Sequence, residues 1–269
     1  MTMHDVGFIG LGDQGAPMAD RIHAAGMPLT VWARRPQVLE PYVAKGATAA
    51  ASIGELGARC GHVGVCVVAD ADVLAVCDEL IPAMARGSRI AVHATVLPET
   101  VVEVARRAEK HGIDVIDAPV SGMRAGAEAG TLAVMCGGSR QAFDAARPVF
   151  ETFGKTIVLL GAVGCGQQAK VIINAMAAAN LGIAHTALEL AETLDLDRAA
   201  FVELASQSGG RSFAFDVRAR MPSPAAFAHN AALLVKDLKI LSMVAPNDRA
   251  VQIFMNAADD FLGAATAQE

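Results

Sequence analysis

Lys170 and Asn174 are the residues whose types and spacing could best act on a polar substrate. They are four positions apart, so in a helix they lie on the same face, one turn from each other. The residues around them, from Ala169 to Met176, are otherwise apolar. A lysine in such surroundings either extends its ammonium group to water or is held in a pocket, where it can exchange a proton. The pattern alone leaves both possibilities open.

A second candidate lies near the start of the chain, where the run Gly10-Leu-Gly12-Asp-Gln-Gly15 follows the apolar residues Val6–Ile9. The pattern Gly-x-Gly-x-x-Gly between a strand and a helix binds dinucleotides. Its glycines permit a tight bend, a close approach to the pyrophosphate and close helix packing. The N–H groups at the start of the following helix would then face the anion. A simple tight turn is the alternative, but the flanking strand and helix favour a dinucleotide site.

Arg34 and Arg35 follow the second expected strand, 28–32. An NAD site usually has an acidic residue there, which accepts hydrogen bonds from the ribose hydroxyls. Two guanidinium groups instead match the charge and geometry of the additional 2′-phosphate of NADP. The sequence therefore predicts NADP in preference to NAD, with an exposed basic turn as the alternative.

The stretch 117–132 is the third candidate. Ser121 and Gly122 would offer a hydroxyl and exposed N–H groups at the end of a strand, which suits a carboxylate. An ordinary glycine-rich connection has the same composition, so spacing alone does not decide between the two.

These residues need elements to position them, and the chain supplies alternating strands and helices over residues 1–162. We expect strands at 63–68, 89–92 and 114–117, with later strands at 131–136 and 156–160 forming a mixed edge. This alternation predicts an α/β fold with a doubly wound sheet that binds its ligands at the carboxyl ends of the strands. Loops containing Val68, Thr95 and Ser121 leave those ends.

The remainder of the chain, 163–269, predicts only helices. One of about 28 residues, at about 167–194, would be some 42 Å long and could bridge the two domains. Further helices are expected at 198–207, 226–244 and 248–264. We therefore expect a dinucleotide-binding domain at 1–162 and an all-α domain at 163–269.

Composition narrows the classes of function. The formal net charge of −6 and the lack of a basic cluster argue against nucleic acid as a partner. The start of the chain resembles no signal peptide, and no apolar run is long enough to predict a membrane span. The five cysteines lack Cys-x-x-Cys spacing and the seven histidines are scattered, so we expect reduced thiols, no metal and a cytoplasmic location.

Four stretches together resemble the β-hydroxyacid dehydrogenase family and occur in its order along most of the chain. They are Gly7–Ala19, Asp117–Leu132, Gly164–Lys170 with Asn174, and Lys236–Leu238. The resemblance implies an N-terminal Rossmann domain, a long interdomain helix and an all-α C-terminal domain. It also implies a homodimer or tetramer built on the C-terminal helices, with the active site between the domains.

The resemblance also implies roles for individual residues. Lys170 would be the general acid/base that gives the substrate oxygen a proton as hydride arrives, and desolvation and nearby cations would lower its pKa. The implied substrate-binding residues are Ser121, Gly122, Met123, Asn174 and Lys236. The implied cofactor-binding residues are Gly10, Leu11, Gly12, Asp13, Gln14, Gly15, Arg34, Arg35, Val68, Thr95 and Lys236.

The expected activity is the NADP-dependent interconversion of a small β-hydroxy acid and its semialdehyde or keto form. Met123 departs from the family pattern, which usually has a glycine there, so its thioether would fill part of the substrate pocket. Two alternatives stay open. One is an imine reductase of the same architecture, which typically lacks the lysine and the Asp-Ala-Pro-Val-Ser-Gly run found here. The other is a non-catalytic cofactor-binding module.

Overall fold

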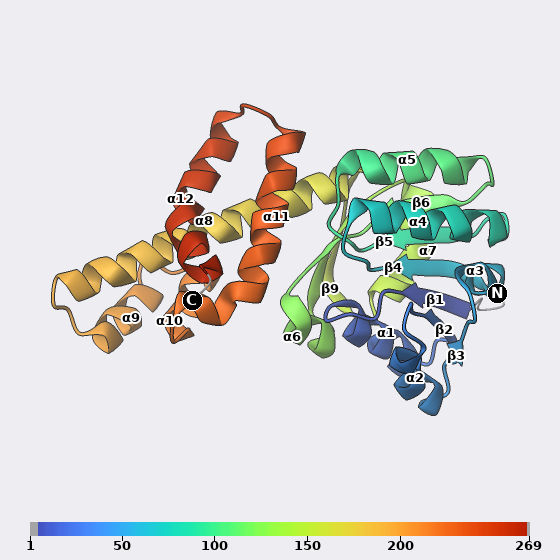
Figure 1. Cartoon of the computed structure of the whole chain (residues 1–269), viewed down its shortest axis with the longest axis horizontal. Coiled ribbons are helices and arrows are strands. Elements are labelled where there is room, and N and C mark those ends of the chain that lie inside the picture. The colour runs from blue at the N-terminus through green and yellow to red at the C-terminus, as the bar shows by residue number, and fades with distance from the viewer. Residues whose placement is uncertain (1–4, 268–269) are drawn as a thin grey trace. The chain divides into compact units, whose positions relative to one another are not determined.

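The computed structural model describes residues 5–267 and divides into two compact units, Met1–Lys170 and Val171–Glu269 (Figure 1). The division falls inside helix α8 (Cys165–Thr193), which begins in the first unit and continues in the second. Residues 1–4, which include most of the chain start considered above, lie outside the described residues.

The first unit is built on a mostly parallel sheet. Parallel pairing joins six strands in the order β3-β2-β1-β4-β5-β6. Their bounds are β1 (Asp5–Ile9), β2 (Leu29–Trp32), β3 (Thr48–Ala49), β4 (Cys60–Val65), β5 (Arg89–Val92) and β6 (Asp114–Asp117). The chain runs outward from β1 to β3 and then returns to β4 on the other side of β1. The carboxyl ends of β1 and β4 are therefore the switch point at which doubly wound sheets bind ligands.

The far side of the sheet is mixed, as the sequence predicted. Strand β8 (Leu132–Gly137) runs antiparallel to β6 and β7 (Val120–Ser121) but parallel to β9 (Gly154–Gly161). The two-residue strands β3 and β7 were not predicted, because so few residues show no alternation of polar and apolar positions.

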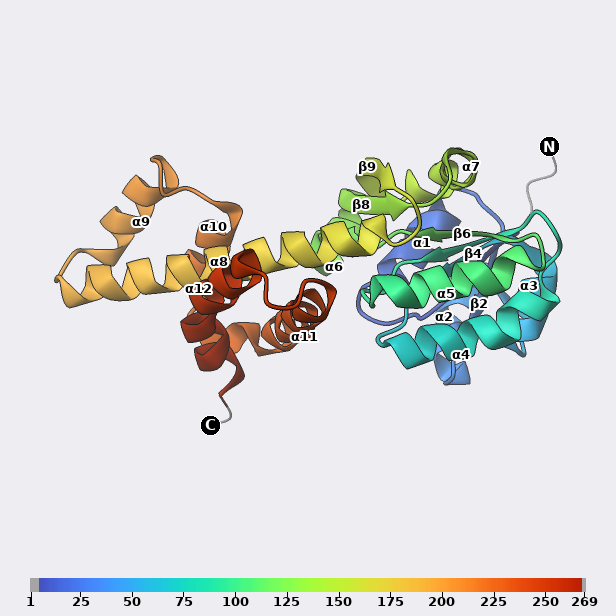
Figure 2. The same ribbon diagram turned by 90° about the horizontal axis from the view of Figure 1, so that it is seen from above.

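Helices cover both faces of this sheet (Figure 2). On one face, α1 (Gly15–Ala24) and α7 (Arg140–Phe150) contribute Met18, Ile22 and Phe150 to one buried cluster. On the other, α3 (Ile53–Arg59), α4 (Asp70–Leu80) and α5 (Pro98–Glu109) contribute Leu56, Leu80 and other residues to a second cluster. The remaining elements of the unit are η1 (Pro36–Leu39), α2 (Glu40–Ala44), η2 (Ile81–Ala83) and α6 (Met123–Ala129).

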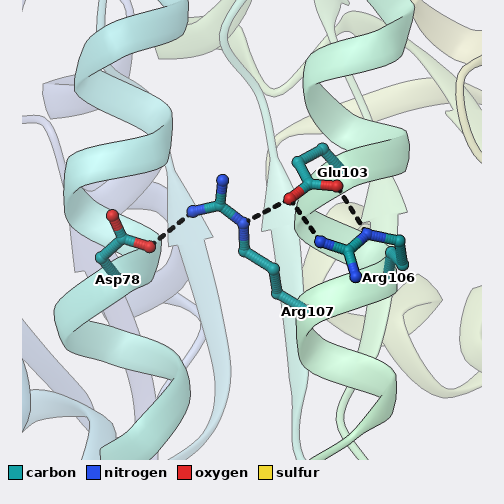
Figure 3. Close-up of polar contacts among 4 residues, drawn as sticks. All are labelled: Asp78, Glu103, Arg106 and Arg107. Carbon is teal, nitrogen blue, oxygen red and sulfur yellow. Dashed lines mark hydrogen bonds and ion pairs between the residues drawn. The ribbon is translucent and has the colours of Figure 1, made fainter.

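An ion-pair chain ties α4 to α5 at the surface (Figure 3). Arg107 donates to Asp78 of α4 at 2.6 Å and to Glu103 of its own helix at 2.8 Å. Hydrogen bonds from Arg106 and then Arg107 lower the pKa of Glu103 to about 2. All four side chains are solvent-accessible, so these ion pairs contribute little to the stability of the fold.

The described residues of the second unit form helices joined by turns and loops, without a strand. It contains the continuation of α8 with α9 (Arg198–Ser206), α10 (Phe213–Arg220), η3 (Pro224–Phe227), α11 (Ala228–Val244) and α12 (Arg249–Thr266). The expected long helix, all-α region and last two helices are present, whereas α10 was missed. Gly182 allows α8 to cross α12 closely, because a Cβ there would overlap the carbonyl of Ala257. Buried Leu188 and Phe215 pack α10 against α8.

Helix α8 is long and apolar enough to cross a membrane by length and composition alone, with a mean hydropathy of 1.5 over its most apolar window. Half of that window is buried inside the structure, and core helices of this kind commonly pass the same test. The feature is therefore weak support for a membrane span.

Candidate functional site

The glycine-rich turn connects β1 to α1 at the switch point. Gly10 has a φ of +97°, and a Cβ there would collide with the backbone carbonyl of Cys66. A Cβ on Gly15 would collide with the carbonyl oxygen of Gly10. Gly12, in contrast, has nothing within 4 Å of its Cβ position. The first and third glycines are thus required by the fold, whereas Gly12 leaves its backbone open to a ligand, which is what a pyrophosphate needs.

Helix α1 presents an uncapped N-terminus beside this turn. Gln14 at the N-cap position makes no side-chain capping bond, and the first turn contains no acidic residue. The positive end of the helix dipole is therefore available to an anion. Together with the open face at Gly12, this fits the diphosphate of a dinucleotide. The carboxylate of Asp13 lies in the same turn, but it is paired with Arg124, from which it accepts a hydrogen bond at 3.1 Å.

Arg34 and Arg35 are both exposed directly after β2, which pairs in parallel with β1. Their position is at the same edge of the sheet as the glycine-rich turn. Arg34 lies 3.7 Å from Asp72 at the start of α4, with its side chain 78% exposed. Both guanidinium groups are therefore open to solvent at this edge of the sheet.

Val68 and Thr95 follow β4 and β5 at this edge. Val68 is 63% exposed, so its side chain is open to solvent at this edge. Asp70 ties the two loops together, because its Oδ1 accepts from the N–H of Leu97 at 2.9 Å and from the hydroxyl of Thr100 at 2.6 Å.

Ser121 ends β7, and the backbone then turns sharply into α6. Gly122 has a φ of +136°, and Met123 a φ of +56°. The left-handed region is costly for a side chain such as that of methionine, so Met123 is a strained position at the start of a helix. Its side chain is 42% exposed, so it has room to contact a ligand.

The first turn of α8 is anchored to the sheet by Asp117, a fully buried carboxylate at the end of β6. Its oxygens accept from the backbone N–H groups of Gly164 and Gln167, each at 2.8 Å. Burial raises the pKa of Asp117, against backbone hydrogen bonds that lower it. A Cβ on Gly166 would lie 2.7 Å from Asp117 Oδ2, so only glycine allows this approach.

Lys170 lies one turn beyond these anchored residues and is 8% exposed. Burial of a lysine is uncommon and usually requires interactions that hold it. The sequence left open whether Lys170 extends to water, and the structure places it in the buried part of α8.

In the second unit, Asn174 and Lys236 are brought together by Asp237, a buried residue of α11. The amide of Asn174 donates to Asp237 Oδ2 at 2.5 Å, and the ammonium group of Lys236 lies 3.5 Å from Oδ1. Asp237 thus holds the amide of Asn174 by a hydrogen bond and forms an ion pair with the neighbouring Lys236.

Sequence reasoning missed the individual roles of Gln167 and Asp237. The adjacent Gln167 and Gln168 are chemically identical in the sequence, and only the fold buries the first and exposes the second. Asp237 was visible within the Lys-Asp-Leu signature, but its partner Asn174 is 63 residues away in the chain.

Comparisons with known proteins agree with this geometry. Residues 5–161 match the NAD binding domain of 6-phosphogluconate dehydrogenase. Residues 164–269 match the family described as NAD-binding of NADP-dependent 3-hydroxyisobutyrate dehydrogenase. These matches cover both units.

Named relatives point the same way. The mitochondrial 3-hydroxyisobutyrate dehydrogenase of Drosophila melanogaster is 34% identical over 90% of this chain and 78% of its own. The NAD-dependent L-serine dehydrogenase of Pseudomonas aeruginosa is 34% identical over 80% of this chain and 73% of its own. The structure of a Mycobacterium tuberculosis 3-hydroxyisobutyrate dehydrogenase with L-serine has a TM-score of 0.85 at 28% identity, covering 97% of this chain and 93% of that one. This chain therefore belongs to the β-hydroxyacid dehydrogenase family, whose members are NAD(P)-dependent oxidoreductases acting on hydroxyl groups.

Proposed function

We propose that this enzyme interconverts a small, carboxylate-bearing β-hydroxy acid and its semialdehyde or keto form, with NADP as the preferred cofactor and Lys170 as general acid/base. The observation that carries the proposal is the burial of Lys170 one turn after the start of α8, where Asp117 fixes the helix to the end of β6. A buried amine on a helix that is fixed to the end of β6 can exchange a proton with a substrate oxygen.

The cofactor, when bound, supplies or accepts the hydride. The chain's own part is to hold the diphosphate at the uncapped start of α1 and the open face of Gly12. The remaining residues of the turn, Leu11, Asp13 and Gln14, are assigned to the same cofactor. Arg34 and Arg35 would bind the additional phosphate, and Val68 and Thr95 would border the nicotinamide half.

The substrate would be held at its carboxylate by the hydroxyl of Ser121 and the backbone of Gly122, with Met123 limiting its size. We assign substrate contacts also to Asn174 and Lys236, the second of which would reach the cofactor as well. Asp237 supports this assignment, because it accepts a hydrogen bond from the amide of Asn174 and forms an ion pair with Lys236. As hydride adds to the carbonyl carbon, negative charge develops on the oxygen, and Lys170 gives it a proton. Oxidation runs the same transfer in reverse.

We also propose a homodimer or tetramer that forms through the C-terminal helices, without nucleic acid or membrane as partner. Apolar side chains exposed along α8 support this assembly, namely Ile172, Met176, Ile183 and Leu190. The five cysteines are free thiols, which fits a reducing compartment such as the cytoplasm. Light scattering of the purified chain tests the assembly, and a monomer at every concentration would contradict it.

The activity is tested by measuring oxidation of NADPH and NADH with short carboxylate-bearing semialdehydes, β-keto acids and cyclic imines. We expect turnover of carboxylate-bearing carbonyl compounds, with a higher kcat/KM for NADPH. Turnover of imines alone, or cofactor binding without turnover of any compound, would contradict the proposal.

A further inference from the structure

Gln167 uses both ends of its side-chain amide within the first unit. Its Oε1 accepts from the backbone N–H of Val96 at 3.1 Å, and its Nε2 donates to the backbone carbonyl of Ala94 at 2.8 Å. These partners are the residues on either side of Thr95. The side chain of Gln167 is fully buried, so water does not compete for either hydrogen bond.

The same residue is also fixed through its backbone. The N–H of Gln167 donates to Asp117 Oδ2 at 2.8 Å, which links it to the end of β6. Lys170 comes three positions later in α8 and therefore lies on the next turn of the same side of the helix. Gln167 thus connects three segments, which are the loop after β5, the end of β6 and the helical turn that contains Lys170.

We propose that Gln167 is a positioning residue that holds the Thr95 loop in fixed register with Lys170. This inference rests on the proposed function, in which Thr95 borders the nicotinamide half of the cofactor and Lys170 exchanges the proton. Hydride transfer and proton transfer act on the same carbonyl group, so the cofactor beside Thr95 and the amine of Lys170 must both be in position. Small displacements of reacting groups lower the reaction rate strongly.

The chemistry of the amide explains why glutamine is required. The N–H of Val96 needs an acceptor and the carbonyl of Ala94 needs a donor, and both residues are buried. An apolar side chain would leave both groups without a partner, so the loop would move to find new ones. A carboxylate would satisfy Val96 but would face the carbonyl of Ala94 with a second acceptor. A protonated carboxylic acid would satisfy both groups again.

The difference between an ionised and a protonated glutamate at position 167 gives a pH-dependent test. A contact that only stabilised the fold would not make kcat depend on pH in this way. Gln167→Glu, Gln167→Met and the control Gln168→Glu are compared with the wild type in kcat and substrate KM, each across the pH range in which it is folded. Gln168 is the matched control, because it is the next residue in the same helix but is exposed. Hydrogen exchange at the Val96 amide is followed in the same samples.

We expect Gln167→Met to lower kcat at least about tenfold, with a much smaller change in substrate KM. For Gln167→Glu, the ratio of its kcat to that of the wild type rises as the pH falls, because protonation of the buried carboxylate restores the donor. In Gln167→Glu, the protection factor of the Val96 amide against hydrogen exchange should rise towards that of the wild type over the same pH range. Gln168→Glu should follow the wild type throughout.

A constant ratio of Gln167→Glu to wild-type kcat at every pH would overturn the inference, even if Gln167→Met fails to fold. Failure of the proposed function has a different signature. If the wild type turns over none of the carbonyl substrates although its Val96 amide is protected, the proposed reaction is refuted. The positioning role of Gln167 in that reaction is then refuted as well.

Discussion

The backbone N–H of Gln167 donates to the carboxylate of Asp117 at 2.8 Å, although the two residues are 50 positions apart in the chain. One belongs to the first turn of α8 and the other ends β6. A carboxylate that accepts hydrogen bonds from N–H groups at the start of a helix caps that helix. Its negative charge also interacts favourably with the positive end of the helix dipole. The cap is supplied by the sheet, so the helix that contains Lys170 is fixed to the domain expected to bind the cofactor.

Asp117→Asn tests this anchor. An amide can satisfy only one of the two N–H donors with its oxygen and presents its own N–H groups to the other, so a buried donor loses its partner. We expect the free energy of unfolding to fall by about 3 kcal/mol. Chemical denaturation measures it, with exposed Asp144→Asn as the control. An Asp117→Asn protein as stable as the control would contradict the anchoring role.

Arg34 tests the preference for NADP. Loss of its guanidinium group in Arg34→Ala should raise the KM for NADPH about tenfold or more and leave that for NADH nearly unchanged, because only NADPH has the additional phosphate. Steady-state kinetics with both cofactors measure the effect, and Arg59→Ala serves as an exposed arginine on another helix. Equal changes for the two cofactors would refute the assignment.

Asp72→Asn gives a complementary result at the same place. Asp72 lies 3.7 Å from Arg34 and would compete with the additional phosphate of NADPH for its guanidinium group. Its neutralisation should lower the KM for NADPH slightly, by about twofold, because exposed ion pairs are weak.

Met123 combines a strained backbone with a side chain that we propose limits substrate size. Met123→Ala and Met123→Gly both remove the side chain, but only glycine relieves the φ of +56°. We therefore expect Met123→Gly to be more stable than Met123→Ala by about 1 kcal/mol. Both variants should increase kcat/KM for bulkier substrates relative to the smallest one. Identical stabilities for the two variants would show that the backbone at residue 123 is not strained.

Because His62 and His93 are buried, we expect the free energy of unfolding to fall in mild acid. Burial lowers the pKa of His62 to about 3, with Arg89 and His93 adding to the shift. Burial also lowers the pKa of His93 to about 4, although its hydrogen bond to Ala118 opposes the shift. Both are neutral in the folded protein at a pH at which they are protonated in the unfolded chain.

The sign follows from these depressed values. The stabilisation is present above the unfolded pKa of about 6.5 and is lost as the pH falls towards the folded values, at about 1.4 kcal/mol per pH unit for each group. His62→Leu should reduce the slope of unfolding free energy against pH between about 6 and 4 by roughly one proton. Exposed His111→Leu should leave it unchanged. An unaltered slope in His62→Leu would contradict the neutral, buried state of His62.

Much of the fold follows from local sequence. The short, β-branched apolar runs bounded by turn residues indicate the strands of the sheet, and the long Ala- and Leu-rich stretch without proline indicates the helix. Helix α10 was missed because its eight residues follow two glycines and show little periodicity. Ser212, which caps it by accepting from the N–H of Phe215 at 3.0 Å, was the available signal.

The candidate site divides in the same way. The glycines of the turn between β1 and α1 and Lys170 could be recognised because each stands in a short pattern of neighbouring residues. The contacts that Gln167, Asp117 and Asp237 make join segments distant in the sequence, and one chain by itself shows no pattern linking them. Met123 was recognised as a departure, but its positive φ depends on the turn that Gly122 begins.

The most direct measurement compares Lys170→Ala with the wild type in NADPH-dependent reduction of the best carboxylate-bearing carbonyl substrate, together with the Kd for NADPH. If Lys170 supplies the proton, kcat falls by about 10² to 10⁴ while the Kd for NADPH stays the same. A folded Lys170→Ala protein that binds NADPH and keeps the wild-type kcat would contradict the role of Lys170 as general acid/base.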